Sequence, residues 1–245
     1  MNDAKIDFWD HVSEARKRLL LSSIIVLVLG SVCYVYWEFL YSIIAKPAGV
    51  QKFISISVME PFSARFKLAL WGGFLLGFPF ILYQLLAFIV PGLTKREKRF
   101  LIVMALFMVA LFYGGIYFGY TYVLAIAIRW LEAQGAGLIT PYLTISQYIS
   151  FIGLFLLAFG ISFETPVIIV VLVRVGVVRP ITLIKQWRVV VIIILLAAAI
   201  LTPDWSPVTM GIMALPMLVL YILGVGLSFI FAPKKRLRES RSEAG

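Results

Sequence analysis

The sequence has almost none of the side chains on which enzymes and metal proteins commonly rely. Its 245 residues include one cysteine, Cys33, and one histidine, His11. A single cysteine excludes an internal disulfide and a cysteine-based metal site. His11 has no serine, cysteine or metal ligand at a usable spacing, so we interpret it as a solvated residue rather than a catalytic base. Because the chain also has neither a P-loop nor a dinucleotide-binding fingerprint, we expect no enzyme and no metal or cofactor.

Charged side chains are also scarce. They make up 14% of the chain and hydrophobic ones 62%, whereas ordinary soluble domains are about 25% charged and about half apolar. The composition therefore predicts an integral membrane protein. The net charge of +10 is compatible with nucleic-acid binding, but the basic residues form short clusters between apolar runs, as in the cytoplasmic loops of membrane proteins. We therefore expect no nucleic-acid partner.

Six apolar segments are candidates for transmembrane helices. About 20 apolar residues are needed to cross the roughly 30 Å hydrocarbon core. The candidates are residues 19–40, 68–90, 100–127, 148–173, 189–201 and 208–231. The fifth would be only roughly 20 Å long as a helix, and a short connection joins it to the sixth. We expect the last two helices to be short and to reach only part way across the bilayer, or to thin it.

The predicted fold class is an all-α integral membrane protein with six transmembrane helices. Lys and Arg concentrate at both ends and in the connections after the second and fourth spans, which predicts cytoplasmic termini. The two longer connections on the other side are expected to form an ordered extracytoplasmic cap. We expect a single membrane domain over residues 1–245. It comprises a cytoplasmic amphipathic N-terminus lying at the interface (1–18), a six-span bundle (19–231) and a basic cytoplasmic tail (232–245).

Two carboxylates stand out from this background. Glu164 is the one ionisable side chain deep inside a predicted span, where such groups are costly and usually functional. The structural alternative is that its carboxyl satisfies a backbone carbonyl freed by Pro166. Glu97 lies among four bases and, with Thr94, fits a helix-capping box. The functional alternative is an acid that faces a cationic ligand, and the two roles of Glu97 are compatible in alternating states.

Several segments follow one another in a specific order. They are residues 11–18 (HVSEARKR), 60–62 (EPF), 78–84 (FPFILYQ), 87–93 (AFIVPGL), 97–99 (EKR), 158–166 (AFGISFETP) and 200–203 (ILTP). Together they resemble the TatC family, the signal-peptide receptor subunits of the twin-arginine protein translocase. The sequence departs from the family pattern at Ala15, where leucine is common, and in residues 203–209 before the last span.

The resemblance implies a receptor that binds twin-arginine signal peptides of folded cargo proteins from the cytoplasm. It implies assembly with TatA and TatB-type single-span proteins, contacts with membrane lipids, homo-oligomers within the complex, and transport driven by the proton-motive force. The implied location is the bacterial-type plasma (inner) membrane. The residues that match family positions for signal binding are Glu97, Phe88, Glu14, Lys95, Arg16 and Arg18. Glu164 matches an intramembrane polar site, and Pro47, Pro79 and Pro166 are candidates for structural or gating roles.

Other functions fit parts of the pattern. A small secondary transporter or channel would suit Glu164 and the short fifth span, but it would be expected to have more than one polar group at the midplane. An intramembrane enzyme would need a nucleophile with a base, or a metal set. A scaffold that assembles partners without reading a signal differs from a receptor only in peptide binding.

Overall fold

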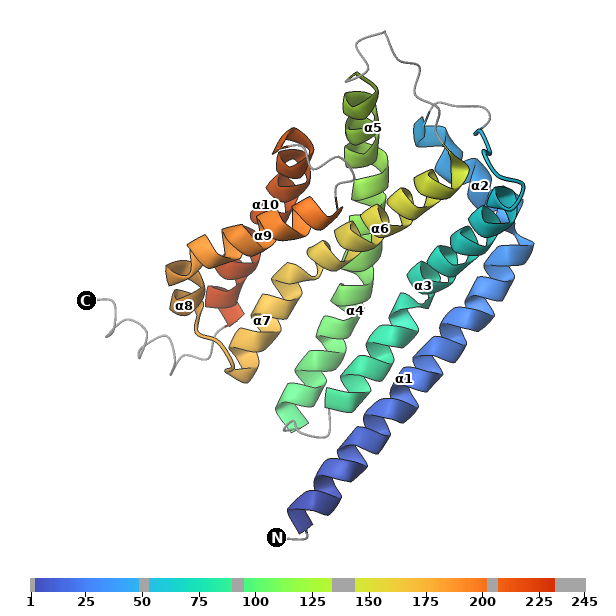
Figure 1. The fold of residues 1–245 in the computed structure, drawn as a ribbon. Helices are drawn as coiled ribbons and strands as arrows, with labels where there is room; N and C mark the ends of the chain where they lie inside the picture. The colour runs from blue at the N-terminus through green and yellow to red at the C-terminus, as the bar shows by residue number, and fades with distance from the viewer. Residues whose placement is uncertain (1–2, 49–52, 90–94, 134–143, 202–206, 232–245) are drawn as a thin grey trace. The chain divides into compact units, whose positions relative to one another are not determined.

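The structure, a computed structural model, describes residues 3–48, 53–89, 95–133, 144–201 and 207–231, and most of them are helical (Figure 1). The helices are α1 Asp3–Val35, α2 Trp37–Ala45, α3 Glu60–Ile89, α4 Lys95–Phe118, α5 Leu124–Ala133, α6 Ile145–Phe163, α7 Thr165–Val175, α8 Pro180–Lys185, α9 Trp187–Leu201 and α10 Pro207–Phe231. Within these ranges the one strand-like pairing is an isolated bridge between Ile54 and Thr144. The prediction of an all-α fold is confirmed.

The predicted spans correspond in order to helical segments. Five are long and apolar enough to cross a membrane, and they are Val12–Val35, Glu60–Phe88, Lys98–Trp130, Ile145–Val175 and Met210–Phe231. A shorter apolar helix, Trp187–Ile200, lies between the last two of these. Helix α9 has 15 residues, about 22 Å, which confirms a short fifth helix.

The expectation that the sixth helix is also short is wrong. Helix α10 has 25 residues, about 37 Å, which is enough to cross the hydrocarbon core. Our inference rested on the brief connection before it, which says nothing about the length of the helix that follows. Pro207, a residue well suited to the first turn of a helix, begins α10, and apolar residues continue it to Phe231.

The N-terminal segment is continuous with the first span. Residues 1–18 were expected to be an amphipathic N-terminus at the interface, and α1 runs without a break from Asp3 to Val35. The interfacial position of this segment stays a prediction. The boundary near residue 18 is a change of polarity. It is not a helix end, because no glycine or proline occurs between residues 3 and 29 and the polar residues there include good helix formers. The basic tail, 232–245, lies outside the described residues.

The chain forms two compact units. Unit 1 consists of Met1–Val109 and Tyr142–Gly153, and unit 2 consists of Ala110–Pro141 and Leu154–Gly245. In unit 1, α1 and α3 run side by side in opposite directions (Figure 1). A Cβ placed on Gly30 would lie 3.3 Å from the carbonyl oxygen of Ala69, so the two backbones approach closely because small residues face each other.

One end of unit 1 has an ordered network of connections. The Glu60 carboxylate accepts hydrogen bonds from the Ile56 amide at 2.8 Å and the Ser146 amide at 3.2 Å. Lys67 donates to the Ser146 hydroxyl at 2.7 Å, and the Tyr148 hydroxyl donates to the Ile44 carbonyl at 2.7 Å. The segment before α3 is therefore held against the start of α6, as the predicted cap requires of these residues.

In unit 2, α7 and α10 form the core. Ile169 of α7 packs with Tyr221 and Val225 of α10, and the Tyr221 hydroxyl donates to the Leu183 carbonyl at 2.7 Å. Helix α7 ends at Val175 and is followed by Gly176, whose φ of 92° is left-handed, a conformation that glycine adopts without strain. This end frees the chain to turn into α8.

Candidate functional site

An ion pair on α1 marks the end of unit 1 where the N-terminus lies. The Arg18 guanidinium donates to Glu14 Oε1 at 2.6 and 3.0 Å. It also approaches the side-chain oxygen of Gln84 on α3, at 3.4 Å. Glu14 and Arg18 therefore lie together, and Arg18 joins α1 to α3. Arg16 is exposed on the same helix.

The pairing of α1 with α3 aligns further predicted residues. Gln84 lies level with Arg18. One turn further along α3 comes Phe88, which is half-buried, and one turn back along α1 comes Glu14. Because the two helices are antiparallel, Phe88 and Glu14 reach the same level of unit 1.

Two of the predicted residues are described as backbone only. Helix α4 begins at Lys95, so Lys95 and Glu97 are the first and third residues of that helix. The third position is the one that a capping box with Thr94 requires of Glu97. Helix α4 begins shortly after α3 ends, at the end of unit 1 where Phe88 lies (Figure 1). The role of these two residues stays a prediction.

The Glu14–Arg18 pair is expected to add little stability. Its side chains are 38% and 24% exposed, and ion pairs four residues apart on a helix contribute about 0.3–0.5 kcal/mol. Glu14→Gln should therefore leave the melting temperature of the detergent-purified protein almost unchanged. A large drop would mean that Glu14 has structural contacts beyond Arg18, and the variant would then be unsuitable for binding assays.

An apolar cavity of about 980 Å³ lies between α3 and the first part of α4. Its lining includes Pro79, Tyr83 and Ala87 of α3 and Lys98, Leu101 and Leu106 of α4. Lys98 lies at the end where α4 begins, beside the level of Phe88. Sequence analysis missed this cavity, because it depends on the spacing between two helices and not on the pattern of either one.

The predicted prolines have different surroundings. Pro79 lies inside α3, which continues through it, and it lines the apolar cavity. Pro47 lies in a 3-10 turn, Lys46–Ala48, after α2, at the opposite end of unit 1 from Glu14. Pro166 is buried near the start of α7, and a Cβ on Gly224 of α10 would lie 2.8 Å from its Cα. Pro166 therefore has a packing role.

Glu164 lies in unit 2, at the junction between α6 and α7, and is 3% exposed. Neither of its carboxyl oxygens has a hydrogen-bond partner among the described residues. The structural alternative required its carboxyl to satisfy the carbonyl freed by Pro166, and that bond does not form in the described part of the chain. The Ser162 hydroxyl donates to the Ala158 carbonyl at 2.6 Å. A functional role for Glu164 stays a prediction.

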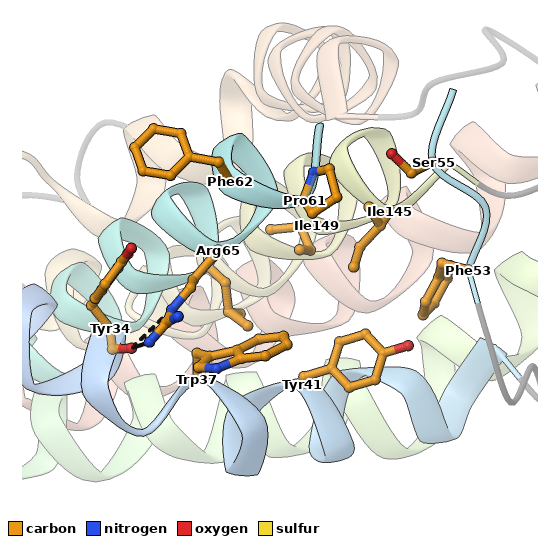
Figure 2. A pocket seen from close by; sticks show the side chains of 11 residues that line it. Tyr34, Trp37, Tyr41, Phe53, Ser55, Pro61, Phe62, Arg65, Ile145 and Ile149 are labelled. Atoms are coloured by element: carbon orange, nitrogen blue, oxygen red, sulfur yellow. Dashed lines mark hydrogen bonds between the residues drawn. The ribbon is translucent and has the colours of Figure 1, made fainter. Parts of the chain in front are cut away.

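A second cavity, of about 500 Å³, lies at the end of unit 1 opposite Glu14, and its lining combines aromatic and aliphatic side chains with Arg65 (Figure 2). Sequence analysis missed this site too. The one signal was the closeness of Tyr34, Trp37 and Tyr41 in the sequence, but Tyr34 belongs to α1 and the other two to α2, so helical spacing alone did not bring them together.

Comparisons with known proteins agree with this fold. The family model described as Sec-independent protein translocase protein (TatC) matches residues 10–216. The chain is 35% identical over 225 residues to the TatC of Synechocystis sp., covering 92% of this chain and 89% of that protein. It is 32% identical over 238 residues to the TatC of Carboxydothermus hydrogenoformans, covering 96% and 98%.

A solved structure is similar as well. A crystal structure of the twin-arginine translocase receptor TatC matches with a TM-score of 0.81 and 34% identity, over 90% of this chain and 99% of that one. The family match, the full-length relatives and the shared fold agree with the apolar helices described above. The chain therefore belongs to the TatC family of multi-pass membrane proteins, core components of the twin-arginine translocation system.

Proposed function

We propose that this protein is the receptor for twin-arginine signal peptides. The binding site would lie at the end of unit 1 where α1 begins, α3 ends and α4 begins. The observation that supports this is the register of α1 and α3, fixed by Arg18 and Gln84, which puts Glu14 level with Phe88 near the first turn of α4. The receptor named in the related crystal structure supports the same function.

The chemistry of the ligand explains the choice of residues. Two adjacent guanidinium groups need acceptors, and a hydrogen bond to a charged group contributes about 1.5–3 kcal/mol. A carboxylate can accept two parallel N–H groups from arginine but not from lysine. Glu97 and Glu14 are the two acids proposed to accept them.

Both acids have internal competitors that a signal must replace. Glu14 already accepts from Arg18, in a pair that contributes about 0.3–0.5 kcal/mol. The capping role predicted for Glu97 would be one hydrogen bond accepted from the Thr94 amide, about 1 kcal/mol. Two charge-assisted hydrogen bonds to a signal outweigh each of these terms. We therefore propose an exchange in which the internal partners yield to the signal arginines, which moderates affinity and allows release.

The hydrophobic stretch of a signal would lie in the apolar cavity between α3 and α4. That cavity is lined at one end by Ala87 and Lys98 and extends along both helices to Pro79 and Val109. A segment that follows the two arginines would enter it directly from the proposed acceptor site. Crosslinks from a signal's apolar residues to Tyr83 and Leu106 would support this arrangement, and their absence would contradict it.

The remaining features of the system follow as proposals. Both termini lie in the cytoplasm of a bacterial-type cell, with the protein in its inner membrane. TatA and TatB-type single-span proteins assemble with it, and several copies of this chain form the working complex. The short helix α9 is our choice for partner docking, because a thinned bilayer favours association of neighbouring helices.

The decisive experiment measures binding of a twin-arginine signal peptide and its lysine–lysine version to the detergent-purified protein. We expect the arginine peptide to bind selectively, and Glu97→Gln to weaken it about tenfold or more, the loss of one charge-assisted hydrogen bond. Glu14→Gln should weaken binding in the same direction. The measurement is fluorescence anisotropy of labelled peptides.

Glu38→Gln is the matched control. Glu38 is an exposed acid on α2, at the other end of unit 1, so its loss changes the net charge equally without touching the proposed site. If both peptides bind alike, or if Glu38→Gln weakens binding as much as Glu97→Gln, the attraction is general and not a receptor site. If Glu97→Ala lowers only the melting temperature, while Glu97→Gln, which can still complete the capping box, leaves it unchanged, the acid is a helix cap.

A further inference from the structure

The cavity around Arg65, called here the aromatic cavity of unit 1, contains a cation beside which the described residues place no acid. Arg65 of α3 lies between two aromatic rings, with its guanidinium carbon 4.2 Å from the centre of Tyr34 and 5.2 Å from that of Trp37. It donates through Nε and Nη2 to the Tyr34 carbonyl, at 3.3 and 3.0 Å (Figure 2). Among the described residues no carboxylate lies within ion-pair distance of it.

Arg65 has a structural role that explains part of this arrangement. Helix α1 ends at Val35, so the Tyr34 carbonyl belongs to its last turn, where carbonyls lack intrahelical partners. A cation is favourable there because the helix dipole is negative at that end. This role uses one side of the planar guanidinium. The positive charge remains without a full counter-charge, and the fork has donors left for an anion.

The cavity lies at the level where two membrane spans end. Tyr34 is one residue before the end of the span Val12–Val35, and Arg65 lies in the second turn of the span Glu60–Phe88. Tyrosine and tryptophan concentrate at this depth, where the apolar core meets the headgroups. An anion that meets Arg65 there is at headgroup level.

An apolar groove continues from the cavity toward the middle of the spans. A second hollow, of about 460 Å³, shares Tyr34 and Phe62 with the aromatic cavity. It runs between α1 and α3 over Gly30 and Ala69 as far as Leu27. From Tyr34 to Leu27 the groove covers about 10 Å of helix, and all of it is apolar except Ser31.

We propose that this combined site binds one anionic phospholipid. Its phosphate pairs with Arg65 between the rings of Tyr34 and Trp37, and an acyl chain lies in the groove over Gly30 and Ala69. The occupant is a lipid and not a partner helix, because a cation at headgroup depth stands at one end of a groove whose lining is otherwise almost wholly apolar, which matches a charged head followed by an acyl chain. Bound there, the lipid would fasten α1 to α3 at the end opposite the signal site.

The test is lipid binding by native mass spectrometry of the detergent-purified protein, titrated with phosphatidylglycerol or phosphatidylcholine of matched chains. We expect phosphatidylglycerol to bind more tightly and to raise the melting temperature. Arg65→Gln should weaken the binding of phosphatidylglycerol about tenfold or more, because a charge-assisted hydrogen bond to its phosphate is lost. Ser31→Phe, which fills the groove without touching Arg65, should weaken both lipids. Inorganic phosphate should give no stabilisation.

Lys46→Gln is the control, since it removes a base at the same end of unit 1 that lines neither hollow. If Arg65→Gln fails to fold, Ser31→Phe still tests the site from its apolar side. Equal binding of the two lipids, an unchanged affinity in Ser31→Phe, or an equal loss in Lys46→Gln would overturn the proposal. So would stabilisation by phosphate alone, or crosslinking of Phe66 to a single-span partner in place of lipid.

Discussion

Replacing Gly73 by alanine is expected to destabilise unit 1 by about 1–3 kcal/mol, the usual cost of overpacking a close contact. A Cβ at this position would lie 2.6 Å from the Gly30 nitrogen and the Val26 carbonyl oxygen, and 2.7 Å from the Gly30 Cα. These are backbone atoms, so no side-chain rotation can make room. Helices α1 and α3 would have to separate, and Gly73→Leu should prevent their packing altogether. Thermal unfolding in detergent measures both variants.

Gly77→Ala is the matched control, in the same helix and one turn away. A Cβ there would meet side-chain carbons of Val26 and Leu29 at 3.5 and 3.6 Å, which is ordinary contact. Alanine is the better helix former by about 1 kcal/mol, so this variant should be as stable as the parent or more so. If Gly73→Ala were as stable as the parent, α1 and α3 would not approach each other as closely at Gly73 as the structure shows.

The contact at Gly73 also shows what can be predicted from the sequence alone and what cannot. Gly73 and Gly77 form a small-residue motif that favours close helix packing, and the pattern treats the two positions alike. Only the register of α1 against α3 distinguishes them. The long apolar runs, in contrast, did locate the spans, because the length and hydropathy of a span depend on one segment at a time.

The features that sequence analysis did not predict depend on more than one segment of the chain, or on a change of polarity within one helix. The polar start of α1 continues the helix, since residues such as Glu14 and Arg18 form helices as readily as the apolar residues after them. Helix α10 is long although its connection to α9 is short. The site around Arg65 was not predicted, because its aromatic partners Tyr34 and Trp37 come from two other helices, α1 and α2. A site formed by side chains from several helices can be recognised only when the packing of those helices is known.

Replacing Glu164 by methionine is expected to stabilise the protein and at the same time to stop protein export. An unsatisfied buried polar group costs about 1–3 kcal/mol, and methionine has a similar length without that cost. The carboxyl is 3% exposed and has no hydrogen-bond partner among the described residues. Ionisable side chains inside membrane spans are costly and usually mark function. The measurements are the melting temperature in detergent and export of a folded reporter that carries a twin-arginine signal.

Ser228→Ala separates this effect from the loss of any buried polar atom. Ser228 is fully buried in the same unit, but its hydroxyl donates to the Val225 carbonyl at 2.6 Å, so its removal should change export little and stability by at most about 1 kcal/mol. If Glu164→Met is stable and exports normally, the acid has no role in transport. If it is less stable than the parent, the carboxyl has a partner in the membrane, and the cost that argues for function disappears. Stabilisation together with lost export is the one combination that a purely structural carboxyl cannot produce.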